Sequence, residues 1–281
     1  MWSYRDLYKN GEKRLLESGI TDAAVDARLL LEFVMDTDRN YLLAHGGEPV
    51  EEAYAERYAA LLERRAAHIP LQQITGFQEF MGLRFAVDEH VLIPRQDTEC
   101  LVEEAMIETM DGMRVLDLCT GSGCILISLM KYKNELVGTA VDLSREALGV
   151  AKKNAAYHQV PVTFVESDLF EKLPVPDKKF DVIISNPPYI RTKEIEMLME
   201  EVRLHEPRQA LDGREDGLYF YREISRESGS YLVRGGKLLF EIGYDQGEQV
   251  CAVMRENGFE QIRIVKDLAG LDRVVCGTRI G

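Results

Sequence analysis

The chain has 281 residues, of which 46% are hydrophobic and 29% charged, so it can bury the core of one large domain or of a large and a small one. Its formal net charge of −14 disfavours general binding to nucleic acid, because phosphates attract basic surfaces. The five cysteines form no CxxC pair, which disfavours a disulfide framework or a zinc site and fits a reducing cytoplasm.

Residues 1–70 are predicted to form a small helical domain. Ser3 is a candidate cap for the first helix, and "TDAAVDARLLLEFVM" repeats apolar residues at helical spacing. "PVEEAYAERYAALLERRAAH" has acids in its first turn and bases in its last, which complements a helix dipole. The charged N-terminus is typical neither of a signal peptide nor of a membrane span.

Residues 71–96 are predicted to connect this domain to the rest of the chain. Two short aromatic and aliphatic runs flank Met81-Gly82, a pattern that indicates a β-hairpin.

Residues 97–281 alternate between strand and helix patterns, which predicts an α/β domain with a doubly wound, mostly parallel sheet. Ligands of such sheets bind at the carboxyl ends of the strands. The predicted strands are "MRVLDLC", "LVGTAVDL", "VTFVESD", "FDVIIS", "KLLFEIG", "EQIRIVKDL" and "RVVCGTRI".

The stretch "DLCTGSGCIL" leads from a strand into a helix, and Gly121 and Gly123 allow a tight turn close to a ligand. A dinucleotide fingerprint would need a third glycine where Leu126 stands, and the G-K-[ST] of a P-loop is absent from the sequence. Asp142 ends the next strand, where an acid can bind ribose hydroxyls, and Asp168 ends the third. The pattern indicates a site for a nucleoside without a pyrophosphate, such as S-adenosylmethionine; the alternative is a structural turn with two strand-end aspartates.

The strand "FDVIIS" ends in "NPPY", which presents an amide, two rigid rings and a phenol. The Asn186 side-chain oxygen and the Pro187 carbonyl can accept the two hydrogens of a substrate amide, and Tyr189 can pack against it. The prolines fix φ and remove competing N–H donors. The alternative interpretation is a rigid strand-end turn with a stacked tyrosine.

With this loop and "NPPY" in one sheet, the chain resembles the class I S-adenosylmethionine-dependent methyltransferases, and in particular the HemK/PrmC family. The resemblance covers nearly the whole chain and includes "VLIPRQDTE" (91–99), "SNPPYI" (185–190), "ALDGREDGL" (210–218), "FEIG" (240–243) and "KDLAGLDRVV" (266–275). It implies a seven-stranded sheet, a helical substrate-docking domain and methylation of the glutamine amide nitrogen in the Gly-Gly-Gln motif of class 1 peptide chain release factors. It implies a cytoplasmic, monomeric enzyme with no metal, no stable nucleic-acid binding and no membrane association.

The resemblance also assigns roles to individual positions. It implies catalysis by Asn186, Pro187 and Tyr189, with Pro188 joining them in binding substrate. The implied cofactor-binding residues are Cys119, Thr120, Gly121, Ser122, Gly123, Asp142, Asp168, Leu169 and Asn186.

Three positions depart from the family pattern. Gln96 stands where the family usually has proline, Cys119 where it usually has glycine, and Leu169 where a tryptophan is frequent. With Leu169 in place of an aromatic residue, stacking on adenine is expected to be weaker or to come from Phe170.

Three other functions remain open at this point. "NPPY" also occurs in amine methyltransferases that act on bases of DNA or RNA, and ribosomal-protein glutamine methyltransferases share much of the pattern. A non-catalytic module that retains S-adenosylmethionine is the third, and the intact "NPPY" argues against it.

Overall fold

The computed structural model describes residues 2–175, 177 and 179–281, and it divides the chain into two compact units. The helical unit contains residues up to Gly76 together with the segment Met199–His205. The sheet unit contains Phe77–Leu198 and Glu206–Gly281. Among the described residues, no helix is long and apolar enough to cross a bilayer.

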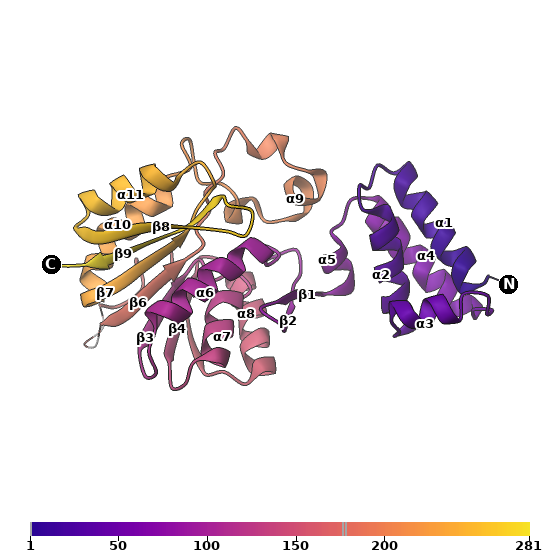
Figure 1. The fold of residues 1–281 in the computed structure, drawn as a ribbon, viewed down its shortest axis with the longest axis horizontal. Coiled ribbons are helices and arrows are strands. Elements are labelled where there is room, and N and C mark those ends of the chain that lie inside the picture. Colours follow the sequence, from indigo (N-terminus) through magenta and orange to yellow (C-terminus); the bar gives the residue numbers. More distant parts are fainter. Residues whose placement is uncertain (1, 176, 178) are drawn as a thin grey trace. The chain divides into compact units, whose positions relative to one another are not determined.

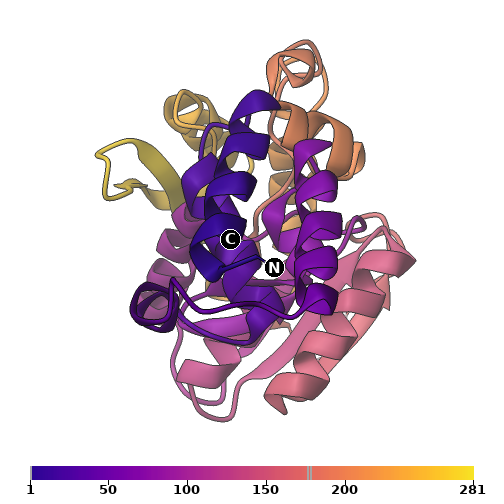
Figure 2. The same ribbon diagram turned by 90° about the vertical axis from the view of Figure 1, so that its right-hand side faces the viewer.

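The helical unit is built on five consecutive helices that pack around one hydrophobic core (Figures 1 and 2). Ser3 caps the first as predicted, because its side chain accepts from the Asp6 N–H while the Asp6 carboxylate accepts from the Ser3 N–H. In the core, the buried Tyr58 hydroxyl donates to the Ala27 carbonyl at 3.0 Å. The helices are α1 (Tyr4–Glu17), α2 (Ala23–Met35), α3 (Arg39–Ala44), α4 (Glu52–Ala66) and α5 (Leu71–Thr75).

A further helix joins this unit from the middle of the chain. It is α9 (Glu200–His205), and it is held by Arg65. The buried Arg65 guanidinium pairs with Asp26 at 2.7 Å and with Glu201 of α9 at 2.9 Å. The compact unit thus differs from the expected domain 1–70, since it extends to Gly76 and takes in a second segment.

The hairpin predicted around Met81-Gly82 is confirmed. β1 (Phe77–Phe80) pairs antiparallel with β2 (Leu83–Ala86), and both turn residues have positive φ, as a two-residue hairpin turn of this type requires. Asn154 of α8 (Arg145–His158) fixes the end of the hairpin, because its side chain exchanges two hydrogen bonds with the Ala86 backbone. The hairpin therefore belongs to the sheet unit.

The seven-stranded, mostly parallel sheet is confirmed, with the order β5-β4-β3-β6-β7-β9-β8. Among the described strands of this sheet, β9 alone runs opposite to the rest, and its pairings with β7 and β8 are antiparallel. The order reverses at β3, which lies between β4 and β6, and such a switch point forms a crevice at the carboxyl ends of the strands. The strands are β3 (Arg114–Leu118), β4 (Val137–Asp142), β5 (Val162–Glu166), β6 (Phe180–Ser185), β7 (Leu232–Glu241), β8 (Phe259–Lys266) and β9 (Asp272–Arg279).

Helices cover both faces of this sheet (Figure 1). α6 (Glu99–Glu108) and α7 (Cys124–Tyr132) contribute to one hydrophobic core together with the hairpin and part of α8. α10 (Tyr219–Tyr231) and α11 (Gly247–Glu256) contribute to the other. The doubly wound architecture expected from the alternating pattern is thus present.

The sequence pattern missed α10. Its buried face combines Tyr221, Ile224 and Tyr231 with the hydroxyl residues Ser225 and Ser228. Tyr221, Ile224 and Tyr231 nevertheless recur at helical spacing.

Candidate active site at the carboxyl edge of the sheet

A pocket of the sheet unit opens at the carboxyl ends of β3, β4 and β6. It brings together most of the residues singled out from the sequence, although they come from four separate segments. Those that line it are Cys119, Thr120, Gly121, Ser122, Asp142, Asp168, Leu169, Asn186 and Pro188. Gly123, Pro187 and Tyr189 are not among its lining residues.

The loop after β3 turns through left-handed conformations. Cys119, Gly121 and Gly123 have φ values of 60°, 54° and 79°. Left-handed φ costs a non-glycine residue about 1–2 kcal/mol, so Cys119 holds a strained position that glycine would occupy freely. Burial raises the pKa of the Cys119 thiol well above its ordinary value, which keeps the thiol neutral beside the pocket.

The two glycines of this loop have different roles. A Cβ atom on Gly121 would meet no atom within 4 Å, so its backbone faces open space. A Cβ on Gly123 would lie 2.8 Å from Ile127 Cδ1 and 3.2 Å from Ala151 Cβ. Gly121 therefore leaves room for a ligand, whereas Gly123 allows the loop to pack against α7 and α8.

Asp142 is anchored at the end of β4 by two backbone donors. Its Oδ2 accepts from the Gly121 N–H at 2.8 Å, and its Oδ1 accepts from the Ser144 N–H at 2.9 Å. Burial raises the pKa of Asp142, and the backbone donors oppose that shift. A carboxylate oxygen has more than one lone pair, so Asp142 can accept further hydrogen bonds from a ligand in the pocket.

A second buried acid, Asp117, lies beneath the loop. Its Oδ2 accepts from the Thr120 hydroxyl at 2.6 Å, whereas Oδ1 has no hydrogen-bond partner in the described part of the chain. Burial raises the pKa of Asp117 to about 7. No role is predicted for Asp117 from the sequence, although it stands near the end of a predicted strand.

The structure corrects the expectation for Phe170. Its side chain is 2% exposed and stacks on Tyr231, with ring centroids 4.5 Å apart, so it belongs to the core and not to the pocket. The aromatic residue that lines the pocket is Phe220, which α10 supplies. Because α10 was not predicted, this aromatic side chain could not be found from the sequence.

Asn186 follows the last residue of β6 and lies in the pocket lining. The preceding Ser185 is fully buried, and its hydroxyl donates to the Leu118 carbonyl at 2.7 Å, which joins the ends of β6 and β3. The Asn186 side-chain nitrogen lies 3.5 Å from the Thr98 hydroxyl. This contact directs the amide nitrogen toward Thr98 and leaves the amide oxygen for other partners.

The segment 211–217 braces the backbone that follows Asn186. Ile190 makes two backbone hydrogen bonds with this segment. Its N–H donates to the Leu211 carbonyl at 3.0 Å, and its carbonyl accepts from the Gly213 N–H at 2.8 Å. A Cβ atom on Gly213 would lie 2.7 Å from two Tyr189 backbone atoms, and one on Gly217 would lie 2.5 Å from the Tyr189 oxygen. The glycines of "ALDGREDGL" therefore permit a close approach to the "NPPY" backbone.

Two further segments line the pocket and were missed as site residues. One is 90–98, including Arg95 and Thr98, and the other includes Gln209 and Ala210. Glu206 joins them, because its carboxylate accepts from the Ile93 N–H at 3.2 Å and pairs with Arg95. Among the described residues, no group of three His, Cys, Asp or Glu side chains is placed to hold a metal ion.

The sheet order, the glycine loop and the acid at the end of β4 define the class I S-adenosylmethionine-dependent methyltransferase fold. The sequence profile of a methyltransferase small domain matches residues 96–217, and that of the PrmC N-terminal domain matches residues 6–76. A solved methyltransferase from Pyrococcus furiosus is 16% identical and covers 81% of this chain and 100% of its own, with a TM-score of 0.53, which supports the fold.

Relatives at higher identity define the family. The release factor glutamine methyltransferase of Geobacter sulfurreducens is 41% identical over 100% of this chain and 98% of its own length. The enzyme of the same name from Clostridium botulinum is 38% identical over 96% of this chain and 97% of its own length. The chain belongs to the release factor glutamine methyltransferase family.

Replacing Gly213 by alanine tests whether the 211–217 segment holds the strand end in place. We expect Gly213→Ala to lower the methyl-transfer turnover about a hundredfold, because displacement of a reacting group by about 1 Å has an effect of that size. The matched control is Gly149→Ala on α8, where a Cβ atom meets nothing within 4 Å. Steady-state kinetics should show unchanged turnover for the control, and equal turnover of both variants would exclude the bracing role.

Proposed function

We propose that this chain transfers the methyl group of S-adenosylmethionine to the side-chain amide nitrogen of the glutamine in the Gly-Gly-Gln motif of class 1 peptide chain release factors. The observation that carries this proposal is the 41% identity, over the whole chain, to a relative named for that activity. Release factors act in translation, so we place the reaction in the cytoplasm. A monomeric state stays a prediction.

The pocket fits S-adenosylmethionine. Asp142 presents a carboxylate that can accept from ribose hydroxyls, and the open space at Gly121 can admit the methionine part of the molecule. Asp168, Leu169 and Phe220 can border the adenine, with Phe220 in the stacking role once expected of Phe170. Cys119, Thr120 and Ser122 complete the loop around the ligand.

The acceptor amide needs orientation more than deprotonation. When bound, S-adenosylmethionine supplies an electrophilic methyl group on a sulfonium. An amide nitrogen is a poor nucleophile, because its lone pair is delocalised into the carbonyl. We propose that the Asn186 side-chain oxygen and the Pro187 carbonyl accept the two amide hydrogens and stabilise positive charge as it develops on the nitrogen.

We assign supporting roles to the neighbours of Asn186. Pro188 lines the pocket and can contact the substrate glutamine, whereas the Tyr189 hydroxyl points to Glu241. We therefore propose that Tyr189 acts by holding the strand end in place more than by covering the amide. Gln246 strengthens this hold, because its side-chain nitrogen donates to the Tyr189 carbonyl at 3.1 Å.

We propose that the helical unit binds parts of the release factor away from the Gly-Gly-Gln motif. It exposes several large apolar side chains, of which Leu43 of α3 is the most exposed at 70%. The others are Trp2, Leu16, Val25, Tyr41, Tyr54, Met199 and Leu204. Exposed apolar side chains of this size can contribute to contact with a protein partner.

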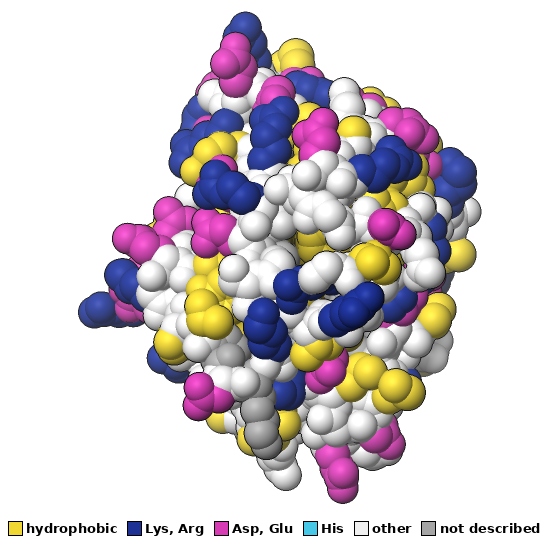
Figure 3. Space-filling model, turned by 90° about the vertical axis from the view of Figure 1, so that its left-hand side faces the viewer, with side chains coloured by type: hydrophobic (Ala, Val, Ile, Leu, Met, Phe, Trp, Pro, Cys, Tyr) yellow, Lys and Arg dark blue, Asp and Glu magenta, His cyan; other side chains and the backbone are white. Residues whose placement is uncertain are grey.

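A nucleic-acid base is a weaker candidate for the substrate. The net charge of −14 opposes the approach of a phosphate backbone. On the face drawn in Figure 3, Lys and Arg side chains are interspersed with Asp and Glu side chains and form no broad basic patch.

The proposed function predicts which molecules accept a labelled methyl group. We expect an intact release factor to be labelled, its Gly-Gly-Ala variant and bulk nucleic acid to remain unlabelled, and a short Gly-Gly-Gln peptide to react with a much higher KM. Leu43→Ser should raise the KM for the intact factor and leave that for the peptide unchanged. Scintillation counting and mass spectrometry of the modified residue would measure these outcomes.

Two different outcomes would contradict two different parts of this proposal. Labelling of nucleic acid without labelling of the release factor would overturn the assigned substrate. Equal KM values for the intact factor and the peptide would overturn only the docking role of the helical unit.

Affinity for S-adenosylmethionine should depend on Asp142. We expect Asp142→Ala to weaken binding by about 1–3 kcal/mol, because ribose hydroxyls would lose a buried acceptor. The matched control is Glu166→Ala, since Glu166 pairs in register with Asp142 but is not among the pocket-lining residues. Calorimetry that shows the same affinity for both variants would contradict the ribose assignment.

Substitution of Asn186 should separate turnover from cofactor binding. We expect Asn186→Ala to lower the single-turnover rate about a hundred- to a thousandfold, because it removes a polar group that acts mainly in the transition state. Asn186→Asp should bind S-adenosylmethionine at least as well and still react slowly, because the carboxylate favours the sulfonium ground state. A wild-type rate in both variants, at saturating substrates, would place the chemistry elsewhere.

A further inference from the structure

Thr98 lies between the Asn186 side chain and a buried acid, Glu241. Thr98 ends a short 3₁₀ helix, Gln96–Thr98, in the "IPRQDTE" segment, and it is 2% exposed. Its hydroxyl oxygen lies 3.5 Å from the Asn186 side-chain nitrogen. The Thr98 hydroxyl also opposes the rise in the pKa of Glu241, which places it near that carboxyl. A 3.5 Å contact is long, as contacts in active sites frequently are before ligands bind.

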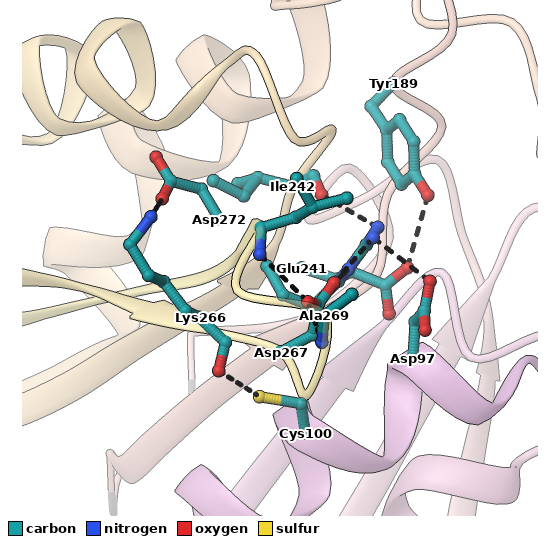
Figure 4. Close-up of polar contacts among 11 residues, drawn as sticks. Asp97, Cys100, Tyr189, Glu241, Ile242, Lys266, Asp267, Ala269 and Asp272 are labelled. Atoms are coloured by element: carbon teal, nitrogen blue, oxygen red, sulfur yellow. Dashed lines mark hydrogen bonds and ion pairs between the residues drawn. The ribbon is translucent and has the colours of Figure 1, made fainter.

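Glu241 ends β7 and is only partly satisfied by hydrogen bonds. The Tyr189 hydroxyl donates to its Oε1 at 3.3 Å (Figure 4), while Oε2 is buried and has no hydrogen-bond partner among the described residues. The Tyr221 hydroxyl donates to the Glu241 backbone carbonyl at 3.0 Å, which fixes the position of the residue. A buried carboxyl with an unsatisfied oxygen costs stability, so its presence beside the pocket points to a functional role.

Several ionisable groups face Glu241 from other elements. Arg273 of β9 is the cation among them, but its guanidinium is engaged at 3.0 Å by both Asp97 and Asp267. Burial raises the pKa of Glu241 to about 7, the nearby Asp97 adds to the rise, and Thr98, Arg273 and Tyr189 oppose it. The groups on neighbouring elements are Asp97, Cys124, Tyr189, Tyr221 and Arg273.

We propose that Glu241 and Thr98 are positioning residues that fix which way the Asn186 amide points. A threonine hydroxyl has one proton to donate. The unpartnered Oε2 of a charged Glu241 can attract that proton. Only lone pairs of the Thr98 hydroxyl then remain to face Asn186, so the Asn186 nitrogen must lie toward Thr98. The Asn186 oxygen is then directed to the pocket, where the proposed function, on which this inference rests, needs an acceptor.

The opposite orientation would be unproductive. A flipped Asn186 amide would present N–H donors to the N–H donors of the substrate amide. Protonated Glu241 can donate a hydrogen bond to Thr98, which frees the Thr98 proton to bond the Asn186 oxygen and favours the flip. The carboxylate form of Glu241 is therefore the productive one, and turnover should fall as the pH falls through about 7.

Variants of Thr98 and Glu241 test this relay by kinetics. We expect Thr98→Val to lower kcat about tenfold to a hundredfold, because it removes a hydrogen bond that orients an active-site side chain. The KM for S-adenosylmethionine should change little. Thr98→Ser should restore most of kcat. Glu241→Gln should lower kcat and abolish the pH inflection near 7. The matched control is Thr109→Val, because Thr109 is equally buried but its hydroxyl donates only to the Ala105 carbonyl.

A measurement without substrate keeps this inference distinct from the proposed function. In the full chain labelled with ¹⁵N-asparagine, the Asn186 side-chain amide is identified by its loss in Asn186→Ala. We expect its proton shifts to titrate near pH 7 in the wild type, and not in Glu241→Gln or Thr98→Val. Absence of that titration in the wild type, or a Thr98→Val kcat equal to that of the control, would overturn the relay even where release factors are methylated. Failure of the wild type to methylate release factors would instead overturn the proposed function.

Discussion

The site depends on one constraint, which is that the backbone after β6 must stay fixed although its strand pairing ends there. The prolines at 187 and 188 contribute rigidity but cannot donate hydrogen bonds, so other groups must hold the chain. Ser185 joins it to β3 on one side, while Gly213 and Gly217 allow a second segment to pack closely against Tyr189. These contacts explain why a short strand-end motif requires distant glycines and a buried serine.

The same edge of the sheet concentrates buried acids. Burial raises the pKa of Asp117 and of Glu241 to about 7 and also raises that of Asp142. A carboxyl whose pKa is higher in the folded than in the unfolded state binds more protons when folded, so it reduces stability as pH rises from about 4 toward 7. Ionisation of these buried acids therefore lowers the folding stability near neutral pH, where charged acceptors can face the pocket. The hydrophobic cores on both faces of the sheet offset this loss.

The predictable parts of the molecule are those that a local pattern determines. The alternation of strand and helix patterns predicted the sheet, and the turn residues Met81-Gly82 predicted the hairpin. The glycines after β3 predicted a ligand-binding loop. The unpredicted parts depend on contacts between distant residues. Phe170 was expected to be available for stacking but pairs with Tyr231. Phe220 replaces it in the pocket from α10, a helix that was not predicted.

One stretch of chain serves both compact units. After Ile190 it supplies α9 to the helical unit, returns at Glu206 to hold Ile93 and Arg95, and then forms the segment that braces Tyr189. The chain on either side of α9 thus connects the helical unit covalently to Glu206 and to the segment 211–217, which hold the lining of the pocket in place. Removal of the N-terminal helices would deprive Glu201 of its Arg65 partner and α9 of the unit on which it packs. The segment 211–217, which follows α9 and fixes the end of β6, would then also be less well held. A role of the helical unit in substrate binding is therefore separable from its structural role only by substitutions at its exposed surface.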